Sequence, residues 1–256
     1  MERKWSMIDN HVHVGWYTDG YHSPNSVWVA EIEAGINEFV VSSTSTCAEL
    51  YKLVVKEMCE LKRVGGNNVH PLLWITPRMM KTWGIRYMLH SKINWQGIKL
   101  HWGAHREWYY NKRLLYKVLN IARCKSWPVL LHTGESKECQ PNVFTAIIND
   151  YPDLKFVLAH GRPIDQTIDV LRSCSNTFVD TAFMPSNHIS LLIDEGFSDR
   201  IIFGTDTPID MVYNKGRPMS EYIQLCLSQL RSVTTSEQFD IITNRHIYKL
   251  IKRFLS

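Results

Sequence analysis

Short apolar, β-branched runs alternate with longer amphipathic segments along almost the whole chain. Runs of about 4–8 residues are typical of buried parallel strands, because both faces of such strands are covered. The pattern predicts strands at residues 7–14, 38–43, 69–75, 97–101, 128–132, 155–160, 177–180 and 200–204.

The segments between these strands repeat their apolar residues at helical spacing. In residues 48–64, apolar side chains recur at positions 50, 53, 54, 58 and 61, which lie on one face of a helix. The same pattern predicts helices at residues 111–124, 142–150, 165–174 and 187–195. Helices that connect successive strands imply a parallel sheet with right-handed crossovers.

Eight such units without a linker predict an α/β protein with a single domain, a closed (β/α)8 TIM barrel over residues 1–256. We expect residues 236–256 to form closing C-terminal helices and the irregular stretch 207–218 to act as a lid. An open, doubly wound sheet is the alternative fold. It is less favoured because neither GxGxxG nor GxxxxGK[ST] occurs in the chain.

The composition, with 45% apolar and 21% charged residues, is that of a soluble globular protein. No apolar run approaches the roughly 18 residues of a membrane span, and the polar start of the chain does not resemble a signal peptide. Six scattered cysteines without a CxxC pair indicate reduced thiols and therefore a cytoplasmic protein. A net charge of +4 is too small to predict a nucleic-acid partner.

Two of the eleven histidines, His11 and His13, lie on the first predicted strand. Residues i and i+2 of a strand point to the same face, so both imidazoles can reach one point inside a barrel. A single HxH pair is weak evidence for a metal site, because it also arises by chance.

Further polar residues end other apolar runs. Lys99 lies near the end of the fourth predicted strand, His132 and His160 end the fifth and sixth, and Asp206 follows the eighth. A barrel gathers its catalytic groups at the C-terminal ends of its strands. The conjunction predicts a metal site whose candidate ligands are His11, His13, His132, His160 and Asp206.

Imidazole and carboxylate ligands suit Zn²⁺ first, with Mn²⁺, Fe²⁺ or Ni²⁺ as substitutes. An open coordination position would hold water and lower its pKa toward neutrality. Asp206 is then placed to accept the proton of that water and pass it to a leaving group. His160 could stabilise negative charge on a substrate oxygen, or it could ligate a second metal ion.

Five motifs in this order resemble the amidohydrolase superfamily of metal-dependent barrels, most closely the amidohydrolase-related branch that includes aminocarboxymuconate-semialdehyde decarboxylase-like enzymes. Asn244, within residues 242–250, also resembles the closing helix of that family. The resemblance spans nearly the whole chain. The motifs are IDNHVH (8–13), GIKLHW (97–102), PVLLHTG (128–134), FVLAHG (156–161) and FGTDTP (203–208).

The resemblance implies a site with one metal ion, held by His11, His13, His132 and Asp206, with His160 as a catalytic residue beside it. Lys99 keeps a site with two metal ions open, because some members of the superfamily bridge two metals with a carboxylated lysine on the fourth strand.

Lys99 has a second interpretation, as a cationic anchor for a substrate carboxylate or phosphate. His101 shares its strand face with Lys99 and is a candidate substrate-binding residue. Arg162 follows His160-Gly161 where a second glycine is common in this branch, and Glu135 adds an acid after the fifth strand. Arg162 could bind an anionic group of the substrate, or it could pair with Glu135 on a loop.

The sequence therefore predicts a metal-dependent hydrolase of amidohydrolase type, acting on an amide, ester or lactone-like bond of a small molecule, with one or two Zn²⁺ ions per chain. One alternative is a non-oxidative decarboxylase on the same scaffold. Another is a phosphodiesterase related to TatD-type DNases, which carry a glutamate where this chain has Lys99. The last is a degenerate barrel without activity. No nucleic-acid or membrane partner is expected, and homo-oligomers are a family-level expectation.

Overall fold

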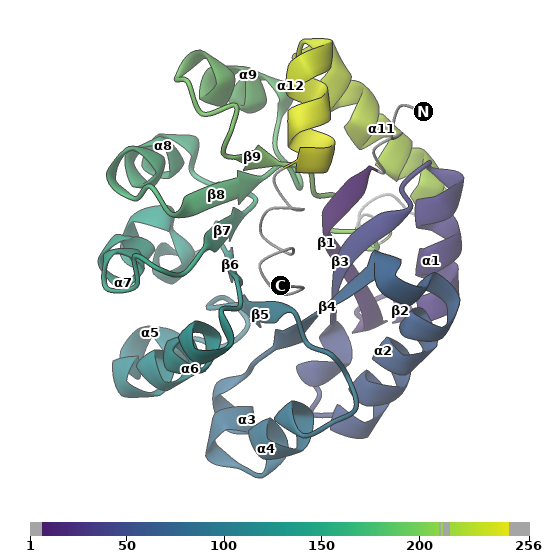
Figure 1. Ribbon diagram of the computed structural model, residues 1–256, viewed down its shortest axis with the longest axis vertical. Helices are drawn as coiled ribbons and strands as arrows, with labels where there is room; N and C mark the ends of the chain where they lie inside the picture. Colours follow the sequence, from purple (N-terminus) through teal and green to yellow (C-terminus); the bar gives the residue numbers. More distant parts are fainter. Residues whose placement is uncertain (1–6, 210, 212–215, 246–256) are drawn as a thin grey trace.

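The computed structural model describes residues 7–209, 211 and 216–245, and its strands form one sheet in the order β2-β1-β3-β4-β5-β6-β7-β8-β9. From β1 to β9 the strands are arranged in a ring around a common centre (Figure 1). Their bounds are β1 Ile8–Tyr17, β2 Gly20–His22, β3 Glu38–Ser43, β4 Val69–Trp74, β5 Gly97–Leu100, β6 Val129–His132, β7 Phe156–Ala159, β8 Thr177–Asp180 and β9 Ile201–Ile202.

The pairs from β1–β3 through β8–β9 are all parallel, which confirms the parallel α/β sheet. β3 and β8 have the predicted bounds, whereas β9 has two residues instead of the predicted five. The prediction missed β2, which pairs antiparallel with the end of β1. Thr18 and Asp19 form the turn between them, and Gly20 begins β2.

Helices lie outside the ring of strands (Figure 1). The helix predicted at 142–150 is instead a 3₁₀ turn, Pro141–Phe144, followed by a short helix, α7. The helices are α1 Pro24–Glu33, α2 Tyr51–Gly65, α3 Pro77–Lys81, α4 Gly84–Leu89, α5 Glu107–Tyr110, α6 Lys112–Lys125, α7 Thr145–Asn149, α8 Ile164–Ser173, α9 Ser186–Asp194, α11 Met219–Ser232 and α12 Ser236–Asp240.

Local signals explain where the long helices begin and end. The side chain of Asn111 accepts a hydrogen bond from the backbone N–H of Leu114 and thereby caps the start of α6. Ser126, in the left-handed conformation, ends the same helix. In α2, Lys62 and Arg63 occupy the last turn, where cations interact favourably with the helix dipole.

Successive strand residues alternate between two hydrophobic clusters. Residues such as Val41, Leu73 and Leu131 pack outward against the helices. A separate cluster fills the inside of the ring, consistent with period-two alternation on a sheet whose faces are both buried. Its buried members are Ile8, Val40, Leu72, Leu130, Val157, Ala159 and Ile202.

The register of β1 shifts between Asp9 and Val12. Before the shift, Ile8 packs in the inner cluster, and after it, Val12 and Val14 pack in the outer cluster. The irregularity therefore reverses which positions face inward, as a β-bulge does. As a result His11 and His13, and not their neighbours, face the inside of the ring.

The sheet itself shows no ladder between β9 and β1, so a closed barrel is not seen as such. Residues after β9 nevertheless bond to β1: the N–H of Asn10 donates to the Phe203 carbonyl at 2.9 Å, and the N–H of His13 donates to the Thr207 carbonyl at 2.7 Å. Val12 and Thr207 also form an isolated parallel bridge. These bonds join the first strand to the segment that carries Asp206.

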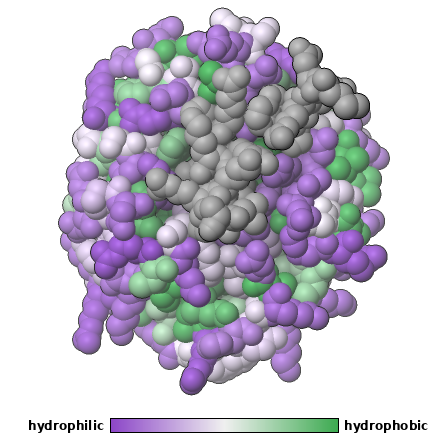
Figure 2. All heavy atoms as spheres, viewed as in Figure 1, coloured by the Kyte–Doolittle hydropathy of each residue, from purple (hydrophilic) through white to green (hydrophobic). Residues whose placement is uncertain are grey.

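Two predictions fall partly outside the described residues: the lid at 207–218 and the closing helices at 236–256. Within the described part, α12 is followed by a π-helix, Ile241–Arg245. No helix among the described residues has the length and apolar character needed to cross a membrane. On the face shown in Figure 2, hydrophilic side chains predominate and apolar ones form small separate groups.

Candidate metal centre

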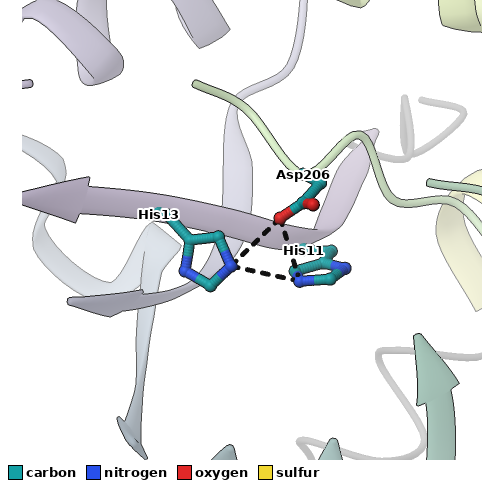
Figure 3. Close-up of side chains that lie close together, drawn as sticks. All are labelled: His11, His13 and Asp206. Carbon is teal, nitrogen blue, oxygen red and sulfur yellow. Dashed lines mark hydrogen bonds and ion pairs between the residues drawn. The ribbon is translucent and has the colours of Figure 1, made fainter. Parts of the chain in front are cut away.

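His11, His13 and Asp206 bring three ligand atoms to one point (Figure 3). Oδ1 of Asp206 lies 3.2 Å from Nε2 of His11 and 3.0 Å from Nε2 of His13, and the two Nε2 atoms are 3.2 Å apart. All three residues are buried. The sequence-predicted pair on the first strand and the aspartate after the last strand are thus brought together.

Backbone geometry places Asp206 against β1. Its N–H donates a hydrogen bond to the carbonyl of His11 at 2.6 Å, and its φ angle is +63°, in the left-handed region. His160 also has a positive φ, +70°. Such conformations are unfavourable for residues other than glycine and are concentrated at functional sites, where the surroundings hold them in place.

Each imidazole of the HxH pair is held from outside by an oxygen. Nδ1 of His11 lies 2.9 Å from Oδ2 of Asp180, and Nδ1 of His13 lies 3.2 Å from the Ser42 carbonyl. A carboxylate or a carbonyl can only accept, so these two oxygens favour a ring proton on Nδ1. In that tautomer Nε2 of each ring does not donate to Oδ1 of Asp206 and can bind a metal ion. Nε2 of each ring is then an acceptor directed at the cluster.

His132 and His160 follow the same rule. Nδ1 of His160 lies 3.2 Å from the Ala182 carbonyl, and Nε2 of His132 contacts the carboxylate of Glu135. Their other ring nitrogens, Nε2 of His160 and Nδ1 of His132, lie 3.2 Å apart. Nε2 of His160 is also 3.8 Å from Oδ2 of Asp206.

Four neutral imidazoles thus direct lone pairs inward, where the Asp206 carboxylate adds negative charge. Two facing lone pairs repel each other unless a cation lies between them, so the donor set fits a divalent metal ion. Among the described residues, two groups of three have ligand atoms within 4.8 Å of one another: His11–His13–Asp206 and His11–His160–Asp180. His132 belongs to neither group, although its Nδ1 faces that of His160.

The pKa values agree with neutral imidazoles. Burial lowers the pKa of His160 to about 4, and it also lowers the pKa of His11 and of His13. Burial, with His160 beside it, holds the pKa of His132 well below its usual value. Burial alone would raise the pKa of Asp206, but the imidazoles of His11 and His13 hold it well below its usual range. At pH 7 the four imidazoles are therefore neutral, each with one unprotonated ring nitrogen, and the Asp206 carboxylate is ionised.

Lys99 is fully buried, and its Nζ lies 2.7 Å from Nε2 of His11. Burial lowers the pKa of its amine, an effect that the charges of Asp206 and Asp180 oppose. Nζ also lies 5.7 Å from the ring centroid of Trp74. The amine is therefore part of the cluster, as the sequence predicted for this strand end.

The two candidate substrate-binding residues lie at the edge of the cluster. The ring of His101 stacks between those of His132 and Trp74, with centroid distances of 3.5 Å and 5.7 Å. Arg162 pairs with Glu135, which is the second of the two interpretations given for these residues. Glu135 in turn contacts His132, so the pair forms one continuous chain of contacts into the site.

Two buried carboxylates of the site were not among the predicted residues. Asp180 ends β8, and that position at a strand end is the same signal that identified His132. Asp9 accepts hydrogen bonds from the N–H of His11 at 2.9 Å and from the N–H and hydroxyl of Thr205 at 3.1 and 2.5 Å. Burial raises the pKa of Asp9 to about 7. The position of Asp9 in the sequence, two residues before His11, was the signal that could have identified it as a residue of the site.

Solved structures share the fold over nearly the whole chain. A probable 2-pyrone-4,6-dicarboxylic acid hydrolase from Acinetobacter baumannii is 14% identical, with a TM-score of 0.72 over 96% of this chain and 99% of that chain. The 5-carboxyvanillate decarboxylase from Sphingomonas paucimobilis is 11% identical, with a TM-score of 0.70 over 97% of this chain and 99% of that chain. A zinc-bound amidohydrolase from Burkholderia multivorans is 11% identical, with a TM-score of 0.70 over 96% of this chain and 99% of that chain.

At these identities the likeness shows a shared fold and nothing more. No curated protein matches the sequence significantly. Residues 92–219, half of the chain, match the sequence model of the family described as Amidohydrolase. This segment includes Lys99, His132 and His160. The chain therefore belongs to the amidohydrolase superfamily, as the resemblance of its motifs indicated.

Proposed function

We propose that this protein is a metal-dependent hydrolase that acts on an amide, ester or lactone-like bond of a small molecule. The observation that carries the proposal is the convergence of Nε2 of His11, Nε2 of His13 and Oδ1 of Asp206, all within 3.2 Å of one another. Two nitrogens and one carboxylate oxygen suit Zn²⁺ first, with other divalent transition metals as substitutes.

The bonds that join residues 203–207 to β1 support a closed (β/α)8 barrel, with these ligands at the C-terminal ends of its strands. When bound, a divalent metal would lower the pKa of water and polarise a substrate carbonyl. Asp206 has a second oxygen, Oδ2, on the side of His160, and it is the group we assign to proton transfer. Nδ1 of His160 donates to the Ala182 carbonyl, which fixes its ring beside that oxygen. Nε2 of His160 carries no proton in this arrangement, so His160 would hold a negatively charged substrate oxygen only after Nε2 has accepted a proton from the reacting groups.

The side chains could hold either one or two metal ions. One ion would use His11, His13 and Asp206, with His132 as a further ligand. A second would be held by His132 and His160, together with a carboxylated Lys99. In the first case Lys99 remains an amine and binds an anionic group of the substrate.

Contacts at the edge of the cluster support a polar, anionic substrate. His101 lies against His132, and Arg162 is 42% exposed, so its guanidinium is accessible from outside. A carboxylate could bind Arg162 in two hydrogen bonds. Of the proteins with this fold, one is described as binding citric acid and others as acting on carboxylated rings.

Decarboxylation is the second candidate, since 5-carboxyvanillate decarboxylase shares the fold over 97% of this chain. The metal ligands would be the same, and the bond broken would be C–C. Detection of CO₂ separates the two reactions.

The experiment that tests the proposal begins with elemental analysis of the purified protein, where we expect one to two transition-metal ions per chain. Carboxylated lactones and aromatic carboxylates are then incubated with the metal-loaded protein, and the products are identified by mass spectrometry. Ring-opened acids support hydrolysis, and CO₂ release supports decarboxylation. A protein without bound metal would favour the degenerate barrel, and cleavage of DNA alone would favour the phosphodiesterase.

A further inference from the structure

Asp180 uses both of its carboxylate oxygens within the site, although no sequence motif singled it out. The residue is fully buried at the end of β8. Oδ2 lies 2.9 Å from Nδ1 of His11, and Oδ1 accepts the backbone N–H groups of His160 at 2.8 Å and Ala182 at 3.1 Å. One carboxylate therefore bonds to a side chain from β1 and to the backbone at the ends of β7 and β8.

The shortest contacts of His11, with Asp180 and with Lys99, favour the same tautomer. The Asp180 carboxylate can only accept, so it requires the proton on Nδ1. On the other side, the Lys99 amine lies 2.7 Å from Nε2 and can donate to it, while Oδ1 of Asp206, an acceptor, is farther away at 3.2 Å. The contacts with Asp180 and Lys99 both favour an unprotonated Nε2, which is the state that a metal ligand needs.

The other oxygen of Asp180 holds an unfavourable backbone conformation. His160 has a φ angle of +70°, and its N–H points to Oδ1. Gly204 packs beside the carboxylate, because a Cβ built on it would lie 3.2 Å from Cβ of Asp180 and 3.0 Å from Cβ of His11. A side chain at position 204 would therefore crowd both Asp180 and His11.

We propose that Asp180 is a positioning residue that fixes the tautomer of His11 and couples it to the backbone of His160. The role goes beyond the proposed reaction, because it sets the donor state of the site before any substrate binds. It rests on the proposed function in one respect, namely that Nε2 of His11 binds a metal ion.

An amide at this position cannot replace the carboxylate. In Asp180→Asn, one end of the side chain is an NH₂ donor, whereas all three partners of Asp180 are donors. The two backbone N–H groups cannot change, but an imidazole can move its proton from one nitrogen to the other. We therefore expect the amide oxygen to face the backbone and His11 to carry its proton on Nε2.

The first measurement needs no variant. Nitrogen NMR of histidine-labelled, metal-free protein at pH 7.5 reports the tautomer of each ring, and the signals absent from His11→Gln belong to His11. We expect the Nδ1–H form of His11 in the unchanged protein. The Nε2–H form there would overturn the proposal, even if Asp180→Asn did not fold.

The second measurement titrates Co²⁺ into the metal-free protein and follows visible absorption. We expect Asp180→Asn to show the Nε2–H form of His11 and to bind Co²⁺ about 10–100-fold more weakly, the usual cost of losing a partner of a ligating histidine. Glu38→Gln is the matched control, because Glu38 bonds Nε2 of His70 at 2.6 Å at the other end of the sheet. Glu38→Gln should change neither the tautomer of His11 nor the affinity for Co²⁺.

Equal Co²⁺ affinity in Asp180→Asn and the unchanged protein, with the Nδ1–H form retained, would overturn the inference. The same loss in Glu38→Gln would also overturn it, since the effect would then reflect any buried carboxylate. Absence of Co²⁺ binding in the unchanged protein would contradict the proposed function. The tautomer measurement, made without metal, would still decide the role of Asp180.

Discussion

Nζ of Lys99 lies 2.7 Å from Nε2 of His11, although 88 positions separate the two residues in the sequence. The same nitrogen of His11 lies 3.2 Å from Oδ1 of Asp206. One lone pair cannot serve an amine and a metal ion together, so metal binding requires Lys99 to give up this contact. Lys99 then becomes free to bind either carbon dioxide or a substrate anion.

Lys99→Met tests this relationship. We expect kcat/KM to fall at least about 100-fold, because either role of Lys99 places its nitrogen beside the reacting atoms. Metal content distinguishes the roles: a carboxylated bridging lysine predicts one metal ion lost per chain, and a substrate anchor predicts full metal content with a raised KM. Elemental analysis of the preparation measures its metal content, and steady-state kinetics on the same preparation measure KM and kcat/KM.

Lys62→Met is a suitable control for that change, because burial also lowers the pKa of Lys62, which lies on α2 and bonds the Val69 carbonyl. Its metal content and kinetics should match those of the unchanged protein. Retention of full activity in Lys99→Met would exclude both roles.

The double variant His11→Ala/His13→Ala removes two of the three atoms that converge in the cluster. We expect bound metal to fall below about a tenth of an ion per chain and activity to disappear, because Asp206 and the remaining imidazoles bind a transition metal weakly without the HxH pair. Elemental analysis after dialysis measures the first effect. Circular dichroism checks that the chain remains folded.

His90→Ala, which changes an exposed imidazole outside the cluster, should retain its metal. If the double variant kept both its metal content and its activity, the ligand assignment would be wrong.

Much of the fold was predictable because each strand is a short apolar run whose ends are marked by polar residues. The alternation of period two placed His11 and His13 on one face, and it placed His132 and Asp206 near the same edge of the sheet. The shift in register between Asp9 and Val12 was not predictable. A buried strand has hydrophobic residues on both faces, so its sequence does not show which residues face the inside of the ring.

The partners outside the cluster were also beyond the sequence pattern. Asp180 and Ser42 act through contacts between strands far apart in the chain, and periodicity carries no information on such pairs. For Arg162 and Glu135, two interpretations were open, and only the structure showed that their side chains meet. Strand ends can thus be read from sequence, whereas the hydrogen bonds that select a tautomer need coordinates.

Arg162→Gln tests recognition of an anionic substrate. Arg162 contacts Glu135, not the ligand cluster, so metal content should stay unchanged. Loss of a charge-assisted pair should raise KM about tenfold or more for a carboxylate-bearing substrate, and should have little effect on its methyl ester. Kinetics with both compounds measure the difference.

The matched control is Glu138→Gln, which removes the charge of a partly exposed carboxylate in the loop that also carries Glu135. Its KM should match that of the unchanged protein. An equal rise of KM for the acid and the ester would show that Arg162 shapes the site without recognising charge.

The metal-free protein should lose stability as the pH falls from about 6.5 to about 4. Burial lowers the pKa of His160 from 6.5 to about 4, so within this interval the unfolded chain binds a proton that the folded chain does not. By linkage, the stabilisation is complete above pH 6.5 and lost as the pH approaches 4, at a cost of about 3 kcal/mol for this residue. Lowered pKa values of His11 and His13 act in the same direction.

Asp9 acts in the opposite direction, because its pKa of about 7 lets the folded chain gain a proton over the same interval. The contribution of His160 is therefore measured as a difference, by urea denaturation of the unchanged protein and His160→Gln at pH 7.5 and pH 4 with chelator present. The stability difference between the two proteins should shift by about 3 kcal/mol in favour of the variant at pH 4. An identical difference at both pH values would mean that His160 titrates normally in the folded chain.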